Sequence, residues 1–323
     1  MQVITLNEEK FRHHRVCPIK KPLVLAFGYF DGVHRGHQGL IQQAQHYAKQ
    51  HDALTAVVTF WPNPNVMLGK TVEAGAITPV QMKERVMAHY GVDVLITVEF
   101  STWVQKLAPH EFLERLFAQF PVAAVVVGFD FRFGKDGKGN ADLLADFPYP
   151  VHVIPEIQYQ NEKISSTVLR TEIHQGQISH VNHMLGRAYE VCGVVMNGLQ
   201  NGRKLGYPTA NLALQEAYVL PATGVYAVRI YVFGQWYQGM ANVGHAPTIR
   251  RDELTGSLGN THEPLIEVNI FDFDATIYGE SVRVQFIERI RPEQKFIGVE
   301  ALKQQLASDK ETIRQYFSEL INS

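Results

Sequence analysis

The chain has 323 residues, more than one ordinary hydrophobic core holds, and this length fits two domains of about 150 residues each. Hydrophobic residues make up 46% of the chain and charged residues 19%, which excludes a disordered or fibrous protein. The 30 basic and 32 acidic residues give a net charge of −2, so electrostatics offers no case for nucleic-acid binding.

Neither a disulfide framework nor a membrane segment is expected. Cys17 and Cys192 are the two cysteines, and they lie far apart and outside any C-x-x-C spacing. The N-terminal residues contain no apolar stretch of signal-peptide length, and apolar runs such as residues 123–127 are far shorter than the roughly 20 residues that span a bilayer. We therefore expect a cytoplasmic protein that binds neither membrane nor nucleic acid.

Residues 22–186 alternate short apolar runs with amphipathic segments. The apolar runs predict buried strands at 22–27, 53–60, 93–100, 123–129 and 151–157. Helices are predicted at 39–50, 80–90 and 110–120. Such alternation favours parallel strands with right-handed crossovers, so residues 1–186 are expected to form a doubly wound α/β domain. Ligands of these sheets bind at the carboxyl ends of the strands.

Residues 187–323 follow a different pattern and are expected to form a small closed β-barrel, which makes the fold class α/β plus all-β. Strands are predicted within 189–198, 224–244, 265–274 and 280–290, and the polar segment 250–264 is predicted to be a loop. The step Phe233–Trp236 predicts a two-residue hairpin with glycine at the first turn position. A last helix is predicted at about 298–321, with its apolar face formed by Leu302, Leu306, Ile313, Phe317 and Leu320.

The stretch 27–40, FGYFDGVHRGHQGL, is the most informative of the first half. A strand ends at Phe27, and a helix opens near Gly36 with free N–H groups and a positive dipole end that suit a phosphate. His34 and His37 flank this opening, where two imidazoles can donate hydrogen bonds to charge that develops on a nucleotide phosphate. The H-x-x-H spacing by itself does not establish a catalytic pair, because a metal half-site or two surface histidines show the same spacing.

Two further segments of the first half carry polar groups. In residues 164–173, ISSTVLRTEI, three hydroxyls precede a helical pattern, and Arg170 lies one helical turn beyond Ser166. These groups can bind nucleotide phosphates, although an ordinary N-cap with Glu172 in a capping role explains the same pattern. In residues 125–140, Asp130 follows a strand and glycines mark a loop that either lines a pocket or turns the chain.

These motifs together resemble the FMN adenylyltransferase module of the prokaryotic bifunctional riboflavin kinase/FAD synthetases. The matching stretches are G-x-F-D-G-V-H-x-G-H at 28–37, V-V-G-x-D-F-x-F-G at 126–134 and I-S-S-T-x-x-R at 164–170. The resemblance implies that His34 and His37 stabilise the α-phosphate of ATP while the FMN phosphate attacks it, and that Asp130 contacts the flavin. The nucleotide-binding residues it implies are Gly28, Phe30, Asp31, Gly36, Asn63, Ser165, Ser166, Thr167 and Arg170.

The second half contains a glycine-rich stretch, residues 193–212, that is not a Walker A loop. Thr209 and Asn211 lie two residues apart and share one face if the backbone is extended, and oxygen ligands of this kind suit Mg²⁺ shared with ATP phosphates. A simple turn between strands accounts for the composition as well. The glycines that permit close approach of a phosphate chain, and the cations beside them, are Gly198, Gly202, Gly206, Arg203 and Lys204.

The stretch G-R-x-L-G-x-P-T-A-N at 202–211 resembles the riboflavin kinase signature, and the resemblance spans about residues 10–320. It implies that Thr209 and Asn211 help to coordinate Mg²⁺ and the nucleotide phosphates. It also implies that Glu267 is the general base for the ribityl 5′-hydroxyl, whereas periodicity alone leaves Glu267 as a solvated strand residue. Arg291 and Phe296 match a segment that helps to cover the flavin.

The resemblance therefore implies a bifunctional enzyme that converts riboflavin to FMN and FMN to FAD with ATP and Mg²⁺, and self-association is compatible with it. Two positions depart from the family pattern: Asn63 stands where the family usually has histidine, and Ala246 where it often has arginine. A homologue with one impaired module, adenylylation above all, is the nearest alternative. A nucleotidyltransferase for another phosphate ester and a flavin-sensing regulator without turnover are the others.

Overall fold

The chain folds into two compact units, residues Met1–Ser166 and Thr167–Ser323. The structure, a computed structural model, describes residues 1–13, 19–69, 75–159, 162–197, 206–245 and 264–322. Each unit is treated by itself below.

The first unit is built on a six-stranded sheet whose strands all run parallel, in the order β1-β4-β3-β2-β5-β6. Its elements in chain order are β1 (Gln2–Leu6), α1 (Glu8–Arg12), β2 (Leu23–Phe27), α2 (Arg35–Gln50), β3 (Leu54–Trp61), α3 (Pro64–Met67), α4 (Val80–His89), β4 (Val94–Glu99), α5 (Pro109–Phe117), β5 (Val122–Gly128), β6 (Val151–Ile154), β7 (Gln158–Tyr159) and β8 (Glu162–Lys163), with short 3-10 turns at Val104–Lys106, Lys135–Gly137 and Asp142–Asp146.

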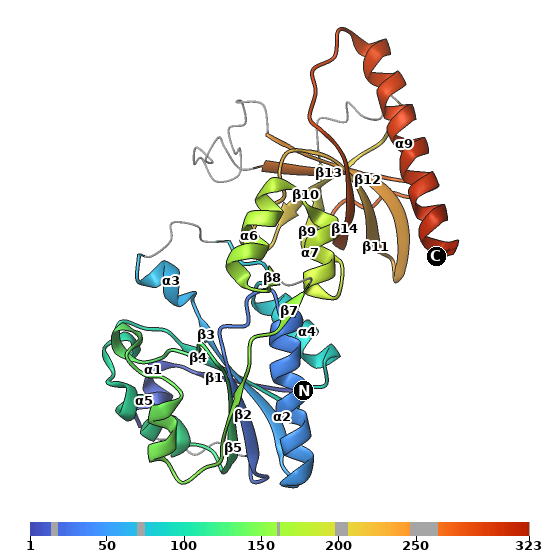
Figure 1. Cartoon of the computed structure of the whole chain (residues 1–323). Coiled ribbons are helices and arrows are strands. Elements are labelled where there is room, and N and C mark those ends of the chain that lie inside the picture. Colours follow the sequence, from blue (N-terminus) through green and yellow to red (C-terminus); the bar gives the residue numbers. More distant parts are fainter. Residues whose placement is uncertain (14–18, 70–74, 160–161, 198–205, 246–263, 323) are drawn as a thin grey trace. The chain divides into compact units, whose positions relative to one another are not determined.

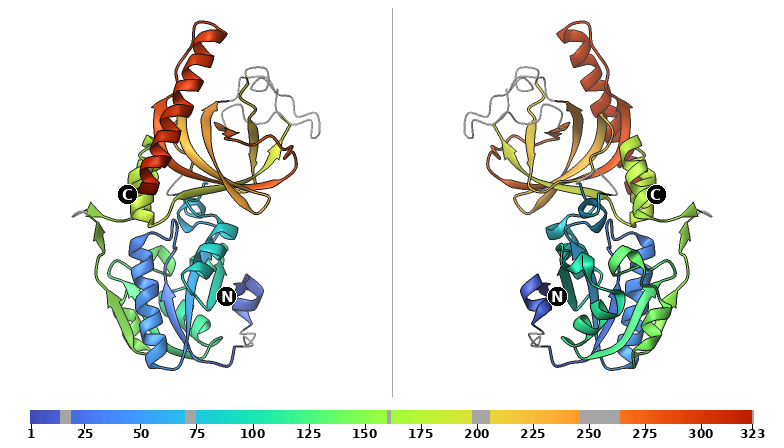
Figure 2. Two further views of the ribbon diagram at one scale, coloured as in Figure 1. Left: turned by 90° about the vertical axis from the view of Figure 1, so that its right-hand side faces the viewer. Right: turned by 90° about the vertical axis from the view of Figure 1, so that its left-hand side faces the viewer.

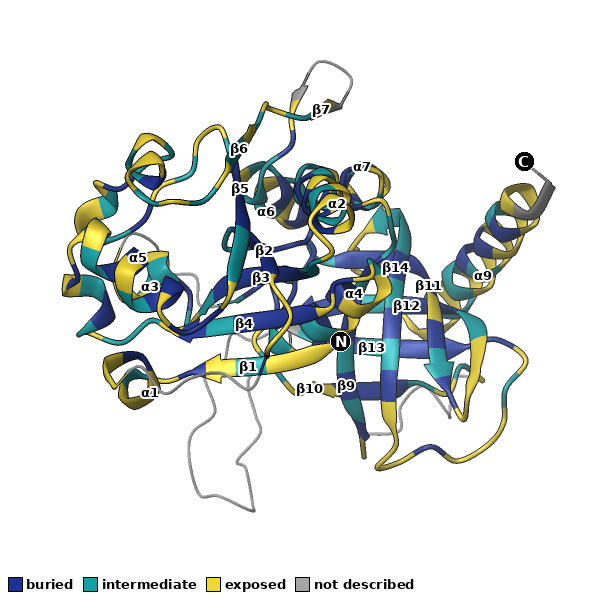
Figure 3. Cartoon of the chain, turned by 90° about the horizontal axis from the view of Figure 1, so that it is seen from below, coloured by how far each residue is buried: buried dark blue, intermediate teal, exposed yellow. Residues whose placement is uncertain are grey.

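The order of the strands confirms the predicted doubly wound domain. The chain winds from β2 outward through β3 to β4 and then returns to β5 and β6, so the topological switch point lies between β2 and β5. Helices α2 and α4 lie on one face of the sheet and α1 and α5 on the other (Figure 1). The central strands β2 and β3 are apolar and buried, whereas β1 at the edge is largely exposed (Figure 3). The carboxyl ends of β2 and β5 are therefore where this fold binds ligands.

The second unit is a closed six-stranded barrel in which every neighbouring pair is antiparallel, in the order β10-β13-β12-β11-β14-β9. Its elements are α6 (Ser166–Gln175), which begins at the last residue of the first unit, α7 (Ile178–Leu185), β9 (Tyr189–Met196), β10 (Ala210–Leu214), β11 (Gly224–Val232), β12 (Gln235–His245), β13 (Pro264–Ile270), β14 (Ser281–Pro292) and α9 (Val299–Asn322). The predicted small barrel with a terminal helix is thereby confirmed.

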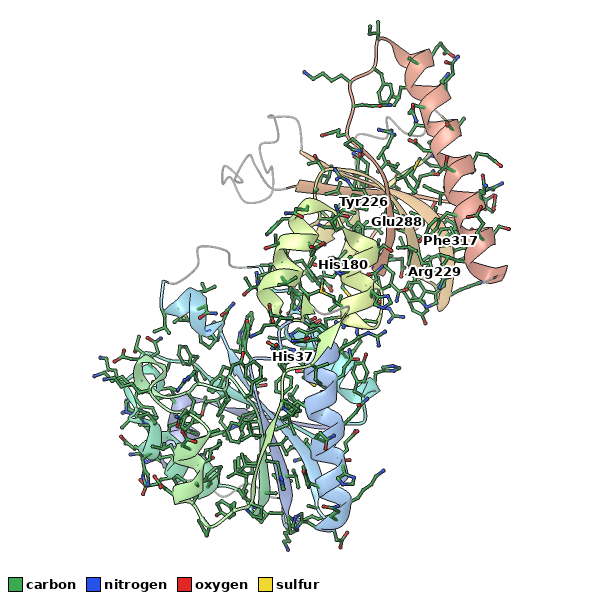
Figure 4. The ribbon with its side chains drawn as sticks, in the orientation of Figure 1. His37, His180, Tyr226, Arg229, Glu288 and Phe317 are labelled. Carbon is green, nitrogen blue, oxygen red and sulfur yellow. The ribbon has the colours of Figure 1, made fainter. Side chains whose placement is uncertain are left out.

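Helix α9 packs along strands β12 and β14 on the outside of the barrel (Figure 2). Ile313 and Phe317 are fully buried in this contact, and the ring of Phe317 also faces the guanidinium of Arg229 (Figure 4). Leu306 packs against the same cluster, as predicted. The prediction was wrong for Leu320, which is 43% exposed.

The hairpin between β11 and β12 was predicted with one error. Val232 pairs with Gln235, so the two turn residues are Phe233 and Gly234, and glycine occupies the second turn position rather than the first. Both residues have positive φ, at 51° and 80°, which is the backbone of a type I′ turn. The right-handed twist of the strands selects this turn even though its first residue is not a glycine.

Each predicted strand and helix is found within a few residues of its expected bounds. Sequence patterns missed the edge strand β1, the short strands β7 and β8, the short helices α1 and α3, helix α7 and strand β10. In the described part of the chain no helix is long and apolar enough to cross a membrane. The segment 250–264 lies almost wholly outside the described residues.

Candidate functional site

The turn between β2 and α2 is held in an unusual backbone conformation. Phe30 and Val33 have φ values of 54° and 44° although neither is a glycine, which costs free energy that the surroundings must supply. Asp31 contributes, because its buried carboxylate accepts hydrogen bonds from the backbone N–H groups of Ile77 and Thr78, at 2.9 and 3.1 Å. Gly28 belongs to the same turn, since a Cβ there would lie 2.9 Å from the Phe30 ring.

The two histidines of the motif stack on each other at the N-terminus of α2. Their ring centroids lie 3.7 Å apart with the planes inclined by 19°. His34 is the N-cap of α2, and its Nδ1 accepts from the backbone N–H of His37 at 3.3 Å, so a neutral His34 ring carries its proton on Nε2. Gly36 leaves room for this geometry, because a Cβ there would lie 3.1 Å from the His34 ring.

His37 is held as a neutral imidazole. Its pKa is lowered well below the usual value, mainly because the ring is buried and further because positive charge on His34 and Lys83 repels a proton. Its Nδ1 is buried and has no hydrogen-bond partner among the described residues. The arrangement offers two imidazole groups at a helix N-terminus, where the backbone favours an anion, and His37 lies at that end of α2 (Figure 4).

Other predicted residues lie near the carboxyl ends of the strands in the first unit. Asn63 follows β3, is 8% exposed, and caps the short helix α3 by accepting from the backbone N–H of Asn65 at 2.9 Å. Asp130 follows β5, and Lys163 contacts its carboxylate at 3.3 Å.

The Ser166 hydroxyl donates to the backbone carbonyl of Asp31 at 2.8 Å, which joins the 164–170 motif to the turn that carries the histidines. Ser165 directly precedes it and is half-buried.

Thr167 and Arg170 follow on α6 and belong to the second compact unit. Arg170 lies one turn after Ser166 in a regular helix, as expected. Glu172 does not act as a capping residue at the start of this helix; its carboxylate lies 3.3 Å from Nδ1 of His180 on α7.

The second unit contains a pocket of about 250 Å³ at the start of β10. Thr209 belongs to its wall, and most of the remaining wall is apolar. The residues that line it are Val195, Pro208, Thr209, Ala210, Val268, Ile270, Phe273, Asp274, Ala275, Thr276, Ile277 and Tyr278. A cavity of this size and composition suits a flat ring system whose polar end reaches Thr209.

Asn211 and Glu267 face each other across two neighbouring strands. The register pairs Asn211 of β10 with Glu267 of β13, and β13 pairs Glu267 on its other side with Asn242 of β12. Residues directly opposite in an antiparallel pair have Cβ atoms about 4.5–5.5 Å apart and point to the same face. Ala210, the first residue of β10, lines the pocket. Successive side chains of a strand point to opposite faces, so Asn211 points away from the pocket and is not part of its wall.

Arg291 and Phe296 lie at the end of β14 and just beyond it. The Arg291 guanidinium makes a two-pronged ion pair with the buried Asp309 of α9, with nitrogen–oxygen distances of 2.8 and 3.0 Å. The same guanidinium lies 5.6 Å from the ring of Phe296. The predicted flavin-contact residues are thus tied to α9.

Several predicted residues lie outside the described part of the chain, namely Gly198, Gly202, Arg203, Lys204 and Ala246. Gly206 is described, with φ at 83° and open space around its Cα. Among the described residues no group of three or more His, Cys, Asp or Glu side chains could hold a metal ion.

Sequence patterns missed two polar residues that the structure places beside these groups. Lys83 of α4 is 5% exposed, and its ammonium donates to the backbone carbonyl of Tyr29 at 2.9 Å. Asn269 is also buried, and its side-chain amide donates to the carbonyl of Pro208 at 2.7 Å, which fixes the chain just before Thr209. The one signal for Lys83 was its spacing of four from Met87, on the buried stripe of α4.

Comparisons with known proteins agree with both halves of this description. A family model described as FAD synthetase matches residues 17–168, and one described as riboflavin kinase matches residues 185–317. A crystal structure described as a macrolide-efflux protein from Streptococcus pneumoniae matches with a TM-score of 0.85 and 34% identity, over 96% of this chain and 99% of that chain. This last likeness supports the fold of the two units.

Relatives of full length carry both names at once. A bifunctional riboflavin kinase/FMN adenylyltransferase from Bacillus subtilis is 37% identical over 95% of this chain and 96% of its own length. A protein with the same description from Listeria monocytogenes is 38% identical over 92% of this chain and 93% of its own length. The two family models, together with relatives at such identity and coverage, show that the chain belongs to the family of bacterial bifunctional riboflavin kinases/FMN adenylyltransferases.

Proposed function

We propose that the chain carries out both reactions of its family in sequence, with the phosphorylation of riboflavin assigned to the barrel and the adenylylation of FMN to the α/β unit. In functional terms we divide the chain into residues 1–186 and 187–323. The observation that carries this proposal is the presence of two separate polar constellations, the stacked His34 and His37 in one unit and the Asn211–Glu267 pair in the other. Each lies within its own family match.

In the kinase reaction the 5′-hydroxyl of riboflavin attacks the γ-phosphate of ATP, and ADP leaves. We assign the nucleotide base to the pocket at the start of β10, with the phosphate chain running past Thr209 toward Asn211. The Thr209 hydroxyl and the Asn211 carboxamide oxygen are oxygen ligands of the kind that Mg²⁺ prefers. The ion would neutralise charge on the phosphates. Glu267 would accept the proton of the hydroxyl, a transfer for which a carboxylate of ordinary pKa suffices because the proton leaves late.

In the adenylylation reaction an oxygen of the FMN phosphate attacks the α-phosphate of ATP, and pyrophosphate leaves. The rings of His34 and His37, the latter as a neutral imidazole, would donate hydrogen bonds to the oxygens on which negative charge develops. The N-terminus of α2 adds the partial positive charge of its free N–H groups. No covalent intermediate is needed once both substrates are aligned, so positioning supplies much of the acceleration.

The remaining predicted residues would bind the substrates. Ser165, Thr167 and Arg170 are assigned to the β- and γ-phosphates of ATP in the adenylylation reaction, and Asp130 to the flavin. In the kinase reaction Arg291 and Phe296 would cover the flavin. The half-buried ring of Phe296, 5.6 Å from the guanidinium of Arg291, supports the roles of these two residues. We place both reactions in the cytoplasm.

The experiment is a time course of the purified protein with riboflavin, ATP and Mg²⁺, followed by chromatography of the flavins. FMN that rises first and then declines as FAD accumulates is the expected result. A second incubation begins from FMN and ATP, so that the adenylylation reaction is measured without the kinase. Flavin that binds without any turnover in either incubation would refute the proposal.

One observation favours a narrower alternative, a kinase whose adenylylation is impaired. Asn63 replaces a histidine that the family usually carries, and its side-chain oxygen is already engaged with the N–H of Asn65. In that case FMN would accumulate in the first incubation, and the second would yield no FAD.

A further inference from the structure

Lys83 is a buried ammonium group near the stacked histidines, and the reaction described above does not use it. It lies on α4 with 5% of its surface exposed. Its Nζ donates to the backbone carbonyl of Tyr29 at 2.9 Å and lies 3.4 Å from Oγ1 of Thr59 and 4.7 Å from the centre of the Tyr29 ring. Removing an ammonium group from water is costly, so a buried lysine is unusual where a neutral residue would fill the space.

The carbonyl that Lys83 binds belongs to the turn that carries His34. The next residue, Phe30, and Val33 three positions later both have left-handed backbone conformations. Asp31 of the same turn accepts from the backbone N–H groups of Ile77 and Thr78, just before α4 begins. The turn is therefore held from the side of α4 at two points, by the ammonium of Lys83 and through the carboxylate of Asp31.

The charge of Lys83 also acts on His37. The pKa of His37 is lowered first by burial, then by His34 and then by Lys83. Burial lowers the pKa of Lys83 itself to about 8, although the negative charge of Asp31 acts in the opposite direction. The titratable groups that face Lys83 in the described residues are thus Asp31 and Tyr29 on the turn and His37 on α2, while β3 contributes the Thr59 hydroxyl.

We propose that Lys83 is a positioning residue for FMN adenylylation, which holds the turn before α2 in the conformation that presents the histidine pair. The inference rests on the proposed adenylylation function. Lys83 acts through the Tyr29 carbonyl and through its charge, and it need not touch either substrate. In this role a neutral His37 and a charged Lys83 coexist between the pKa of the imidazole and a pH of about 8.

The test compares Lys83→Met with Lys49→Met in the full-length protein. Methionine fills similar space without charge, and Lys49 is an exposed lysine on α2, the helix that carries His37. FAD formation from FMN and ATP, FMN formation from riboflavin and ATP, and thermal unfolding are measured for each variant. We expect Lys83→Met to lower kcat for FAD formation about tenfold, the effect of one hydrogen bond to a buried charge, with FMN formation and the melting temperature retained. Lys49→Met is expected to match the wild type in all three.

The pH profile separates positioning from simple packing. In the wild type, FAD formation should decline as Lys83 loses its proton above a pH of about 8, and this alkaline limb should be absent from Lys83→Met. Loss of the charge also allows His37 to take up a proton at higher pH, so the acid limb should move upward. Lys83→Arg keeps the charge and should recover part of the rate.

Three results would overturn the inference. FAD formation by Lys83→Met at the rate of Lys49→Met would show that the group is not needed. If the rate is lower but both pH limbs are unmoved and Lys83→Arg recovers nothing, Lys83 contributes only by packing. If the first unit unfolds in Lys83→Met, Lys83 is needed for folding and not for positioning the histidines. A wild-type protein that makes no FAD would instead refute the proposed adenylylation itself, and the inference with it.

Discussion

The two candidate sites of this chain are kept in place by different means. In the α/β unit the two histidines lie at a turn and at the start of the helix that follows it. Two contacts hold that turn: the ammonium of Lys83 on α4 binds its backbone, and its own Asp31 accepts from backbone N–H groups just before α4. In the barrel, Asn211 and Glu267 lie on regular strands, so the register of β10 and β13 places them opposite each other. A strand needs no special conformation to present a side chain, whereas a turn with left-handed residues does.

This difference has a consequence for mutation. Replacement of a side chain on a barrel strand should affect its own reaction and little else, because the ladder of backbone hydrogen bonds keeps the geometry. Replacement of a group that holds the β2–α2 turn should affect adenylylation without touching the substrates. Each unit also serves as the internal control for the other, because the two reactions are measured separately in one protein.

The largest effect is expected for Glu267→Gln. The amide cannot accept the proton of the riboflavin hydroxyl, so FMN formation should fall by about 10²–10⁴-fold. Because the strand register is kept, adenylylation of added FMN should remain at the wild-type rate. Initial rates of both reactions, measured by flavin chromatography, check this. A kinase rate within about tenfold of the wild type would argue that Glu267 is a solvated strand residue after all.

The converse experiment is His34→Asn. Asparagine is a good N-cap, so the start of α2 should persist while the imidazole is lost. FAD formation from FMN should fall by about 10²–10³-fold, the usual cost of one group that stabilises developing charge, and FMN formation should be unchanged. Far-UV circular dichroism of the variant guards against loss of the helix. Equal losses in both reactions would mean that the two sites are not separate.

Sequence patterns predicted most strands and helices of this chain well. The central strands of the parallel sheet are apolar runs, several barrel strands alternate polar and apolar residues, and most helices have an apolar face. They also found the histidine pair, since a strand, a glycine-rich turn and a helix are local features. They did not find Lys83 or Asn269. These residues bind carbonyl groups 54 and 61 positions away in the chain, and no local pattern contains such a pairing.

Polar residues on a strand illustrate the same limit. Side chains of β13 alternate between two faces, so Asn269 shares the face of Glu267. Asn269 is nevertheless 5% exposed, and its side-chain amide donates to the carbonyl of Pro208. Likewise, spacing alone suggested that Thr209 and Asn211 share one face. The structure begins β10 only at Ala210, so Thr209 reaches the pocket from outside the strand.

The third prediction compares how much a buried and an exposed ion pair of α9 contribute to the stability of the second unit. Two ion pairs tie α9 to the barrel: Asp309 of α9 pairs with Arg291 of β14, and Arg314 of α9 pairs with Asp272. The Asp309 side chain is 2% exposed and that of Asp272 is 78% exposed. Asp309→Asn leaves the Arg291 guanidinium without a buried counter-charge and should destabilise the second unit by about 3 kcal/mol. Asp272→Asn should cost about 0.5 kcal/mol or less, because water screens an exposed pair. Hydrogen exchange of β11 and β14 amides measures both. Similar values for the two variants would show that α9 is not held by the Arg291 ion pair.

The smallest effect is expected at Asn63. It tests whether adenylylation in the α/β unit needs a histidine at this position. A histidine at this position could keep the cap of α3, since Nδ1 of His34 already caps α2 in the same way. When protonated it would add one charge-assisted hydrogen bond to an ATP phosphate, worth about 1 kcal/mol, so Asn63→His should raise kcat/KM for ATP in FAD formation about fivefold. Asn63→Asp also keeps the cap but brings a negative charge, and it should lower the same value. If neither variant changes FAD formation, the side chain at 63 does not face the nucleotide, and the departure from the family pattern at this position leaves adenylylation unaffected.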